Sequence, residues 1–174
     1  MLRKIFAVVF LMVLAAACAR ENATPSAPTL KNLDRRFTEP ATEKPFSAIV
    51  SPSTVSPCSL DGVNDRPAAE KNIVGEKSKV ILSGWAADML NQVAADEMWI
   101  EISGPSTVYL KASGSTEKRP DVASYFNNPA MLETGWRIYA NLSSLASGDY
   151  LLRVIMRTGT KTLICDTKRR LILE

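Results

Sequence analysis

Residues 149–165 read DYLLRVIMRTGTKTLIC, and this stretch carries the clearest structural signal in the chain. Its first half alternates in polarity, with Tyr150, Leu152, Val154 and Met156 on one parity and Asp149, Arg153 and Arg157 on the other. A period of two predicts a β-strand with one buried face. Thr158-Gly159-Thr160 then predicts a turn into a second strand over residues 161–165, so the whole stretch is expected to form a hairpin.

The same alternation occurs in two earlier segments. Met98, Ile100 and Ile102 stand opposite Trp99 and Glu101, and Val108, Leu110 and Ala112 stand opposite Tyr109 and Lys111. Ser103-Gly104-Pro105-Ser106 separates the two runs, which predicts a second hairpin.

Two further strands are expected at residues 79–87, which are nearly all apolar, and at residues 136–142. Between them, Asp121 is expected to cap a short helix over residues 122–126, and residues 86–95 are a weaker helical candidate. Strands spaced by roughly 8–12 residues, without long helices between them, indicate an all-β fold. We therefore predict an antiparallel, Ig-like β-sandwich with one short helix over residues 58–174.

The N-terminus has the three-part layout of an export signal. Arg3 and Lys4 precede a wholly apolar run over residues 5–14, and three alanines lead into Cys18. The apolar run is shorter than the roughly 20 residues that a membrane-spanning helix needs. Residues 1–17 are therefore predicted to be a signal peptide that is removed.

This leader resembles that of a bacterial lipoprotein, in which a peptidase cuts before a cysteine that carries a diacylglycerol. The resemblance implies lipidation of Cys18 and attachment to a membrane through that lipid. In a Gram-negative host, Ala19 in place of Asp implies forwarding to the outer membrane. An ordinary secretory cut after Ala17 or Ala19 is the alternative, and both readings export the chain.

The segment from Cys18 to residue 57 is rich in Pro, Thr, Ser and Ala and has little apolar periodicity. Such a composition buries too little apolar surface to offset the entropy of ordering. We predict a flexible, disordered tether that holds the domain roughly 30–40 Å from the bilayer.

Cys58 and Cys165 remain near the two ends of the predicted domain. In an oxidising compartment a disulfide between them would close a loop of 107 residues, and the alternative is two buried thiols. Either role is structural.

Charge and composition argue against several functions. Without Arg3 and Lys4 the chain has 19 basic and 18 acidic residues, a net charge of +1, and the run Lys168-Arg169-Arg170 is short, so no nucleic-acid partner is expected. There is no His and no catalytic motif, so we expect neither an enzyme nor a cofactor or bound metal. Residues 61–65 (DGVND) lack the spacing of a calcium loop and predict a turn.

The domain also resembles a β-sandwich module that recurs in bacterial envelope proteins, including beside membrane glycosyltransferases. The resemblance rests on Cys58 with Asp61 and Val63-Asn64, on GWAAD at residues 84–88, on RPDVA at residues 119–123 with Phe126, and on Gly135-Trp136 before the hairpin with Cys165. The module has no agreed catalytic residues. The likeness implies an accessory module of the cell envelope that is connected with surface glycans.

Two groups of residues are candidates for a binding surface. Trp99, Glu101 and Tyr109 lie on the parity opposite the apolar residues, and Asp88, Arg119 and Asp121 could cluster at one end of the sandwich, although loop-anchoring hydrogen bonds are the plainer use. Trp85 and Trp136 are expected in the core. The favoured function is a non-catalytic, lipid-anchored envelope module that binds a glycan or an envelope protein. The alternative is a structural or assembly subunit without a small ligand.

Overall fold

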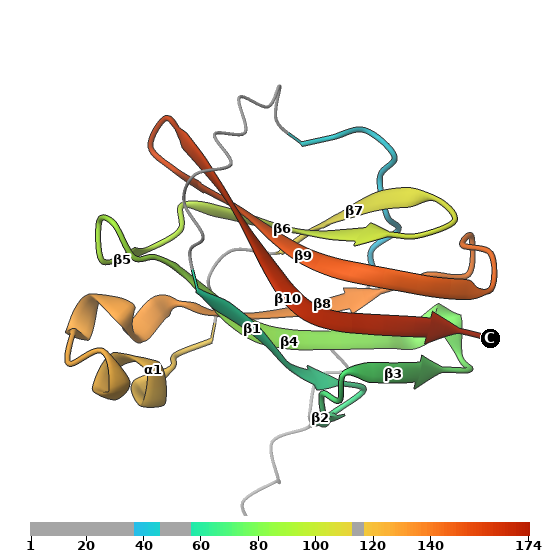
Figure 1. Cartoon of the computed structure of the whole chain (residues 1–174), viewed down its shortest axis with the longest axis horizontal. Coiled ribbons are helices and arrows are strands. Elements are labelled where there is room, and N and C mark those ends of the chain that lie inside the picture. Colours follow the sequence, from blue (N-terminus) through green and yellow to red (C-terminus); the bar gives the residue numbers. More distant parts are fainter. Residues whose placement is uncertain (1–36, 46–56, 113–116) are drawn as a thin grey trace, which may run out of the picture. The chain divides into compact units, whose positions relative to one another are not determined.

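The computed structural model describes residues 37–45, 57–112 and 117–174, all of which fall in one compact unit (Figure 1). The elements are β1 (Cys58–Val63), β2 (Arg66–Pro67), β3 (Lys71–Val74), η1 (Lys77–Lys79), β4 (Val80–Asp88), β5 (Val93–Ala94), β6 (Glu97–Ser103), β7 (Thr107–Lys111), α1 (Pro120–Tyr125), η2 (Pro129–Glu133), β8 (Gly135–Ala140), β9 (Gly148–Thr158) and β10 (Lys161–Leu173). The prediction of an all-β fold with one short α-helix is confirmed.

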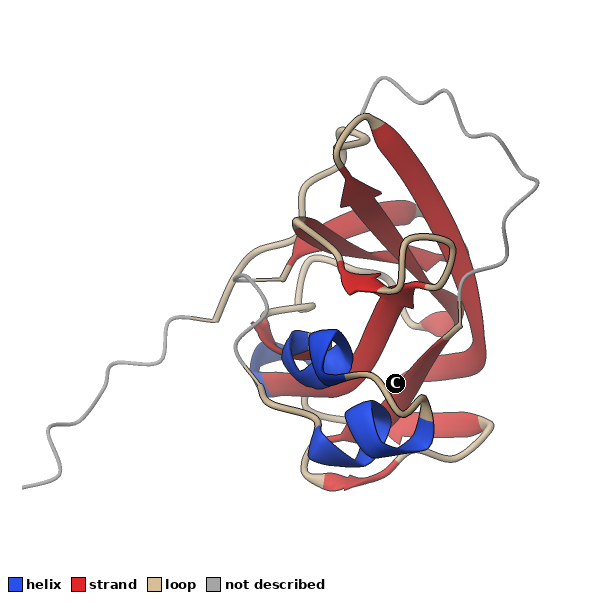
Figure 2. Cartoon of the chain, turned by 90° about the vertical axis from the view of Figure 1, so that its left-hand side faces the viewer, coloured by secondary structure: helices blue, strands red, loops and turns tan. Residues whose placement is uncertain are grey.

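The strands form two sheets of five strands each. Sheet A has the order β2-β1-β4-β5, with β8 also paired to β4, and sheet B has the order β3-β10-β9-β6-β7. Figure 2 distinguishes the strands from the helices by colour, and the helices α1 and η2 pack together at one end of the sheets. The fold is therefore a β-sandwich in the coarse sense that the sequence predicts.

Both predicted hairpins are present in sheet B. In the first, β9 pairs with β10, and in the second β6 pairs with β7 and also lies beside β9. Strand β10 is longer than predicted, because it passes a bulge between Asp166 and Arg169 and continues to Leu173. Lys168 lies in that bulge with a φ of 56°, a backbone conformation that breaks the polarity pattern read from the sequence.

One strand pair differs from the antiparallel prediction. β3 runs parallel to β10, with Lys71 opposite Arg170 and Val74 opposite Leu173. The chain reaches β3 after a tight hairpin between β1 and β2, whose two turn residues Asn64 and Asp65 have φ values of 51° and 59°. The turn predicted at residues 61–65 is thus shorter, and strand β1 occupies its first half.

Strand β4 is the central strand of sheet A and lies between β1 and β8. Gly84 sits where these strands come closest. A Cβ at Gly84 would lie 2.0 Å from the backbone oxygen of Ser59 and 2.7 Å from the Trp136 ring. A glycine is therefore required before Trp85.

The helical predictions are partly wrong. Residues 86–95 form the end of β4, a turn and β5 instead of a helix. Helix α1 is where a helix was expected, but Asp121 lies in its first turn instead of capping it, and the N-cap residue is Arg119. Pro120 begins the helix, as its fixed φ favours.

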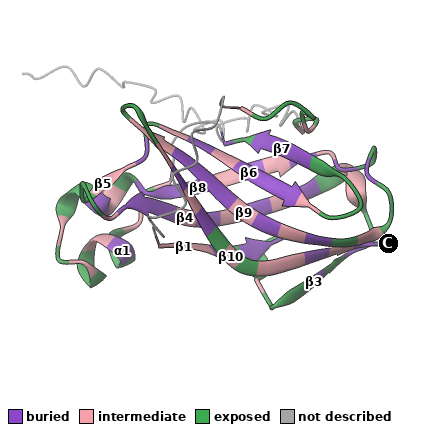
Figure 3. Ribbon diagram, turned by 45° about the horizontal axis from the view of Figure 1, so that its top comes forward, coloured by how far each residue is buried: buried purple, intermediate pink, exposed green. Residues whose placement is uncertain are grey.

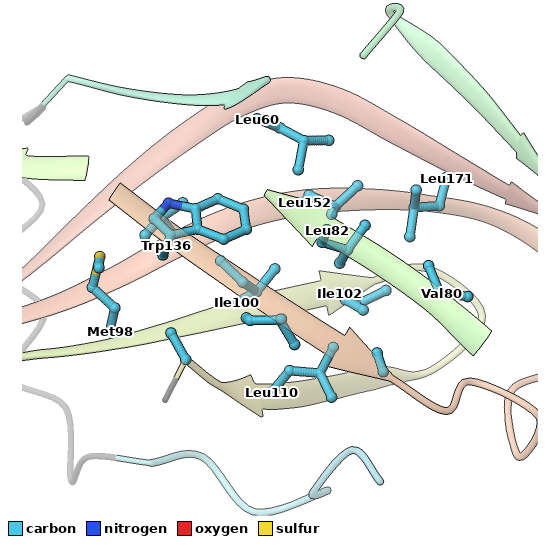
Figure 4. Packing of buried hydrophobic residues seen from close by; sticks show 14 of the residues in the cluster. Leu60, Val80, Leu82, Met98, Ile100, Ile102, Leu110, Trp136, Leu152 and Leu171 are labelled. Atoms are coloured by element: carbon cyan, nitrogen blue, oxygen red, sulfur yellow. The ribbon is translucent and has the colours of Figure 1, made fainter. Parts of the chain in front are cut away.

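The core lies between the two sheets (Figure 4). It includes the predicted inward residues of both hairpins, all of them buried, together with Trp136, Leu60 and Leu82. Figure 3 shows this burial along β4, β8 and β9. Cys58 of β1 and Cys165 of β10 are joined by a disulfide with a Cα–Cα distance of 6.1 Å, which confirms the predicted pair and links sheet A to sheet B.

A segment that the sequence assigned to the tether contacts the sandwich. Residues 37–41, here called the strap, run from the edge strand β8 of sheet A to the edge strand β7 of sheet B. Thr38 donates to Tyr139 of β8 (2.8 Å) and accepts from Asn141 (3.0 Å), while Ala41 exchanges two hydrogen bonds with Tyr109 of β7 (2.8 and 2.9 Å). The prediction of a tether up to residue 57 is therefore wrong for the strap.

Cys18, the predicted signal peptide and the remainder of the predicted tether lie outside the described residues. Within the described ranges, no helix combines the length and the hydropathy needed to cross a bilayer.

Candidate functional site

The first candidate surface lies on the outward face of sheet B. Strand register places Tyr109, Glu101 and Arg153 side by side on β7, β6 and β9. Glu101 is only 3% exposed and forms an ion pair with Arg153. Burial, followed by the neighbouring Glu101 carboxylate, raises the pKa of Tyr109, and Arg153 opposes this rise. Two members of this row, Glu101 and Tyr109, are therefore buried, while Arg153 is partly exposed, so the row is not an open binding face.

Sequence parity predicts which face of sheet B carries Glu101 and Tyr109, but it does not predict how exposed they are. Glu101 and Tyr109 are buried although they point away from the sandwich core, and Tyr109 is also hydrogen-bonded through its backbone to the strap. Trp99 is half-buried, with the Lys111 ammonium 5.6 Å from the centre of its ring. The prediction of a solvent-facing surface at Glu101 and Tyr109 is therefore wrong.

Asp88 does not join Arg119 and Asp121. Its carboxylate is fully buried at the end of β4, where it accepts hydrogen bonds from the backbone of Leu90 (2.9 Å) and Asn91 (3.1 Å) and from the Asn91 amide (2.6 Å). These bonds fix the turn between β4 and β5. The loop-anchoring use of Asp88 is the one that the structure shows.

Arg119 forms a second, separate group of charges. Its guanidinium donates two bonds to Asp121 (2.9 and 2.6 Å) and one to Asp61 (2.6 Å). The hydrogen bonds from Arg119 lower the pKa of Asp121 to about 2, and the pKa of Arg119 is raised, chiefly by Asp121. The group joins the beginning of α1 to strand β1, so its evident role is structural.

A parallel group surrounds Arg137 on β8. Its guanidinium donates to Asp65 (2.6 Å) in the β1–β2 turn and to Glu117 (2.7 Å), and these two bonds raise its pKa. Four carboxylates are thus bonded to two arginines, namely Asp61 and Asp121 to Arg119 and Asp65 and Glu117 to Arg137. None of them is left as an isolated acid or base.

The sequence pieces that carry the family resemblance meet at this end of the sandwich. The rings of Trp85 and Phe126 lie 6.0 Å apart at an edge-to-face angle, and Val122 packs with Ala87 and Met131 in a second small core. Gly135 lets the chain at Glu117 approach, since a Cβ there would lie 2.3 Å from the Glu117 oxygen. These motif residues therefore act first as packing for the helices.

Two large apolar side chains project from the same end. We name this end, residues 89–92 and 120–133, the α1 tip. Tyr125 is 83% exposed and Leu90 is 61% exposed. Next to Tyr125 in the chain, the surface has a pocket of about 330 Å³ lined by Pro120, Ala123, Ser124, Asn127, Asn128, Pro129 and Leu132.

The loops of the α1 tip are bound to one another. The Asn128 amide donates to the backbone of Gln92 (3.1 Å), and its oxygen accepts from Ala130 (3.0 Å). Gln92 and Asn127 both have left-handed φ values, 55° and 48°. Non-glycine residues adopt this conformation rarely, so the surrounding bonds define the loop geometry.

Sequence reasoning missed the α1 tip as a site. It placed a helix at residues 122–126 but gave Tyr125 no role, and it assigned Leu90 to a helical segment that does not exist. The one indication in the sequence was Asp88, two residues before Leu90. An aspartate can accept hydrogen bonds from the backbone of the following residues and so form a turn, which places the Leu90 side chain outside the core.

No group of three or more His, Cys, Asp or Glu suited to a metal ion is present among the described residues. The exposed ring, the adjacent pocket and the fixed loops make the α1 tip the candidate binding site of this domain. No protein-family model, no curated protein and no solved structure matches this chain.

Proposed function

We propose that this chain is an exported, non-catalytic protein of the cell envelope, anchored through a lipid on Cys18, that binds a surface glycan at the α1 tip. The export signal supports the location. The disulfide between Cys58 and Cys165 supports it independently, because such bonds persist in oxidising compartments outside the cytosol. The outer membrane, in a Gram-negative host, is the proposed site of attachment.

The observation that carries the ligand proposal is the exposure of Tyr125. An aromatic ring that is 83% exposed offers a flat apolar face, as stacking on a sugar ring requires. Ser124 and Asn127 beside it are also exposed, and among the described residues neither side chain has a hydrogen-bond partner. Ring, hydroxyl and amide together match the apolar and polar faces of a saccharide.

The state of the acidic residues supports a non-catalytic role. Glycoside hydrolysis needs two facing carboxyl groups, one as acid and one as base or nucleophile. Asp61, Asp65, Glu117 and Asp121 are instead bonded to arginines, and Asp88 is bonded to its own turn. We accordingly propose no enzymatic activity for the domain.

A glycan array tests the binding proposal. Tyr125→Ala should abolish any glycan signal of the mature protein, whereas Tyr125→Phe, which retains the ring, should keep most of it. Because the side chain is exposed, both variants should unfold at the temperature of the wild type. Undiminished binding by Tyr125→Ala would remove the α1 tip as the glycan site.

Labelling of cells with radioactive palmitate tests the anchor. The wild-type protein should incorporate label and Cys18→Ser should not, while Cys58 and Cys165 remain in their disulfide in both. Equal labelling of the two proteins would refute lipidation at Cys18.

A protein partner in place of a glycan is the second candidate, and the exposed Leu90 favours it. An aliphatic side chain that is 61% exposed at the α1 tip is suited to the centre of a protein interface. In this version the sandwich is an assembly subunit without a small ligand. Co-purification of a stable complex that is lost in Leu90→Asp, with no signal on the glycan array, would support it.

The finer fold class is also proposed. An Ig-like sandwich typically has a disulfide between its two sheets and a buried tryptophan in the core. The Cys58–Cys165 bond and Trp136, which is fully buried, support that comparison.

A further inference from the structure

Two arginines in the described ranges differ from the others. Five arginines form ion pairs with carboxylates at 2.7 Å or less, namely Arg119, Arg137, Arg153, Arg157 and Arg170. Arg66 and Arg169 have no ion pair with a described residue. Arg66 is exposed on β2.

Arg66 lines a pocket of about 440 Å³ between the β1–β2 hairpin and β3, here called the β2–β3 pocket. Lys71 lines it as well and has no ion pair among the described residues. The lining contains no carboxylate, and Asp65, which precedes Arg66 in the chain, is bonded to Arg137. Glu70 precedes Lys71 in the chain but is not part of the lining. The pocket therefore carries two positive charges that have no ion-pair partner within residues 37–45, 57–112 and 117–174.

Further donors border the same pocket. The Asn64 oxygen accepts from the backbone of Ile81 (2.8 Å), which fixes the side chain and leaves its NH₂ group to donate. β3 is an edge strand, and the carbonyls of Glu70 and Val74 accept hydrogen bonds from the backbone of Arg170 and Glu174 on the side of β10. In a parallel ladder alternate residues face each neighbour, so the N–H groups of Lys71 and Ile73 point away from β10, to the open edge.

The two edge strands of sheet B, β7 and β3, therefore differ in their outer neighbours. The edge at β7 is hydrogen-bonded to the strap through Tyr109, whereas β3 has no strand on its outer side among the described residues. Ile73 is 69% exposed on β3, although an isoleucine on an open edge is unfavourable without a partner. Ile73 can therefore make apolar contacts with a ligand, while Arg66, Lys71 and the outward N–H groups of β3 can bind its anionic group.

We propose that the β2–β3 pocket binds the carboxylate or phosphate group of an acidic saccharide. Arg66 and Lys71 provide charge-assisted hydrogen bonds to the anion, and the Ile73 side chain packs against the sugar ring. This site is separate in sequence from the α1 tip. It does not depend on the function proposed there.

The test is an NMR or calorimetric titration of the mature protein with glucuronic acid, glucose 1-phosphate and glucose. The two acidic sugars should bind at least about 10-fold more tightly than glucose, and Arg66→Gln and Lys71→Gln should each weaken their binding by about 10-fold. Affinity for the acidic sugars should fall as salt is raised. Equal affinity for glucose and glucuronic acid would overturn the proposal.

Arg169→Gln is the matched control, because it removes the other unpaired arginine without altering the pocket lining. It should leave the affinity for the acidic sugars unchanged. A loss of affinity equal to that of Arg66→Gln would mean that net charge, and not the pocket, determines binding, and would refute the proposal. Vesicles containing phosphatidylglycerol form a separate arm, since a lipid headgroup presents the same phosphate chemistry. Binding to the vesicles without binding to either acidic sugar would refute the saccharide assignment.

Discussion

The disulfide between Cys58 and Cys165 allows a quantitative prediction. The double variant Cys58→Ala/Cys165→Ala removes the cross-link, and alanine avoids placing a hydroxyl at Cys165, which is only 4% exposed. The bond closes a loop with a sequence separation of 107 residues. The chain-entropy relation gives a stabilisation of about 4.8 kcal/mol at 25 °C for a loop of this length.

The corresponding change in melting temperature follows from the size of the domain. With an unfolding entropy of about 2.1 cal/mol/K per residue, a domain of roughly 120 residues loses about 0.25 kcal/mol of stability per degree near its midpoint. Loss of about 4.8 kcal/mol should then lower the melting temperature by roughly 15–20 °C.

The assay is urea unfolding of the mature protein, followed by tryptophan fluorescence, with three comparisons. Wild type reduced by a phosphine should lose most of the stability that the double variant loses, because both lack the cross-link, although only the variant also lacks the two sulfur atoms. Cys18→Ser should match oxidised wild type, since that cysteine is not in the bond. A difference below about 1 kcal/mol between oxidised wild type and the double variant would refute the entropic argument.

Three further predictions concern individual backbone and ionic contacts. Gly84→Ala should destabilise the fold by about 3 kcal/mol or more, measured by urea unfolding, because the added Cβ would lie 2.0 Å from a backbone oxygen of β1; a near-neutral result would contradict this geometry. Thr38→Pro removes an N–H of the strap and should cost about 1–2 kcal/mol, with faster hydrogen exchange at Tyr109; unchanged exchange would mean that the strap does not protect this edge. Because Arg119 lowers the folded-state pKa of Asp121 to about 2, below its ordinary value, this exposed pair should add at most about 1 kcal/mol above pH 4 and lose it as the pH falls to 2. Denaturation of wild type and Arg119→Gln across this range should therefore converge at low pH, and a constant difference would exclude the pair as its source.

Much of sheet B could be predicted because its strands alternate strictly. Met98, Ile100 and Ile102 are buried as their parity requires, and the turn at Gly159 joins β9 to β10 where the sequence indicates. Local periodicity was sufficient in these strands, since each has one face in the core. The cysteine pair was predictable for a different reason, namely that only two cysteines remained in the domain.

The errors arose where distant segments decide the environment. Parity placed Glu101 and Tyr109 outward, but it could not show that Arg153 pairs with the first or that the strap bonds the second. The parallel course of β3 was missed because four residues give too short a pattern to assign a partner. Tyr125 was overlooked since exposure on a short helix leaves no periodic signal.

The strap also limits the distance between the domain and the membrane. If Cys18 carries the proposed lipid, 19 Cα–Cα steps lead from that residue to Phe37, so the two can be at most about 63–68 Å apart. Attachment beginning only at Cys58 would permit about twice that radius. A force applied through the lipid would consequently act first on the hydrogen bonds between the strap and the strands β7 and β8. It would act on the Cys58–Cys165 disulfide only after those hydrogen bonds had broken.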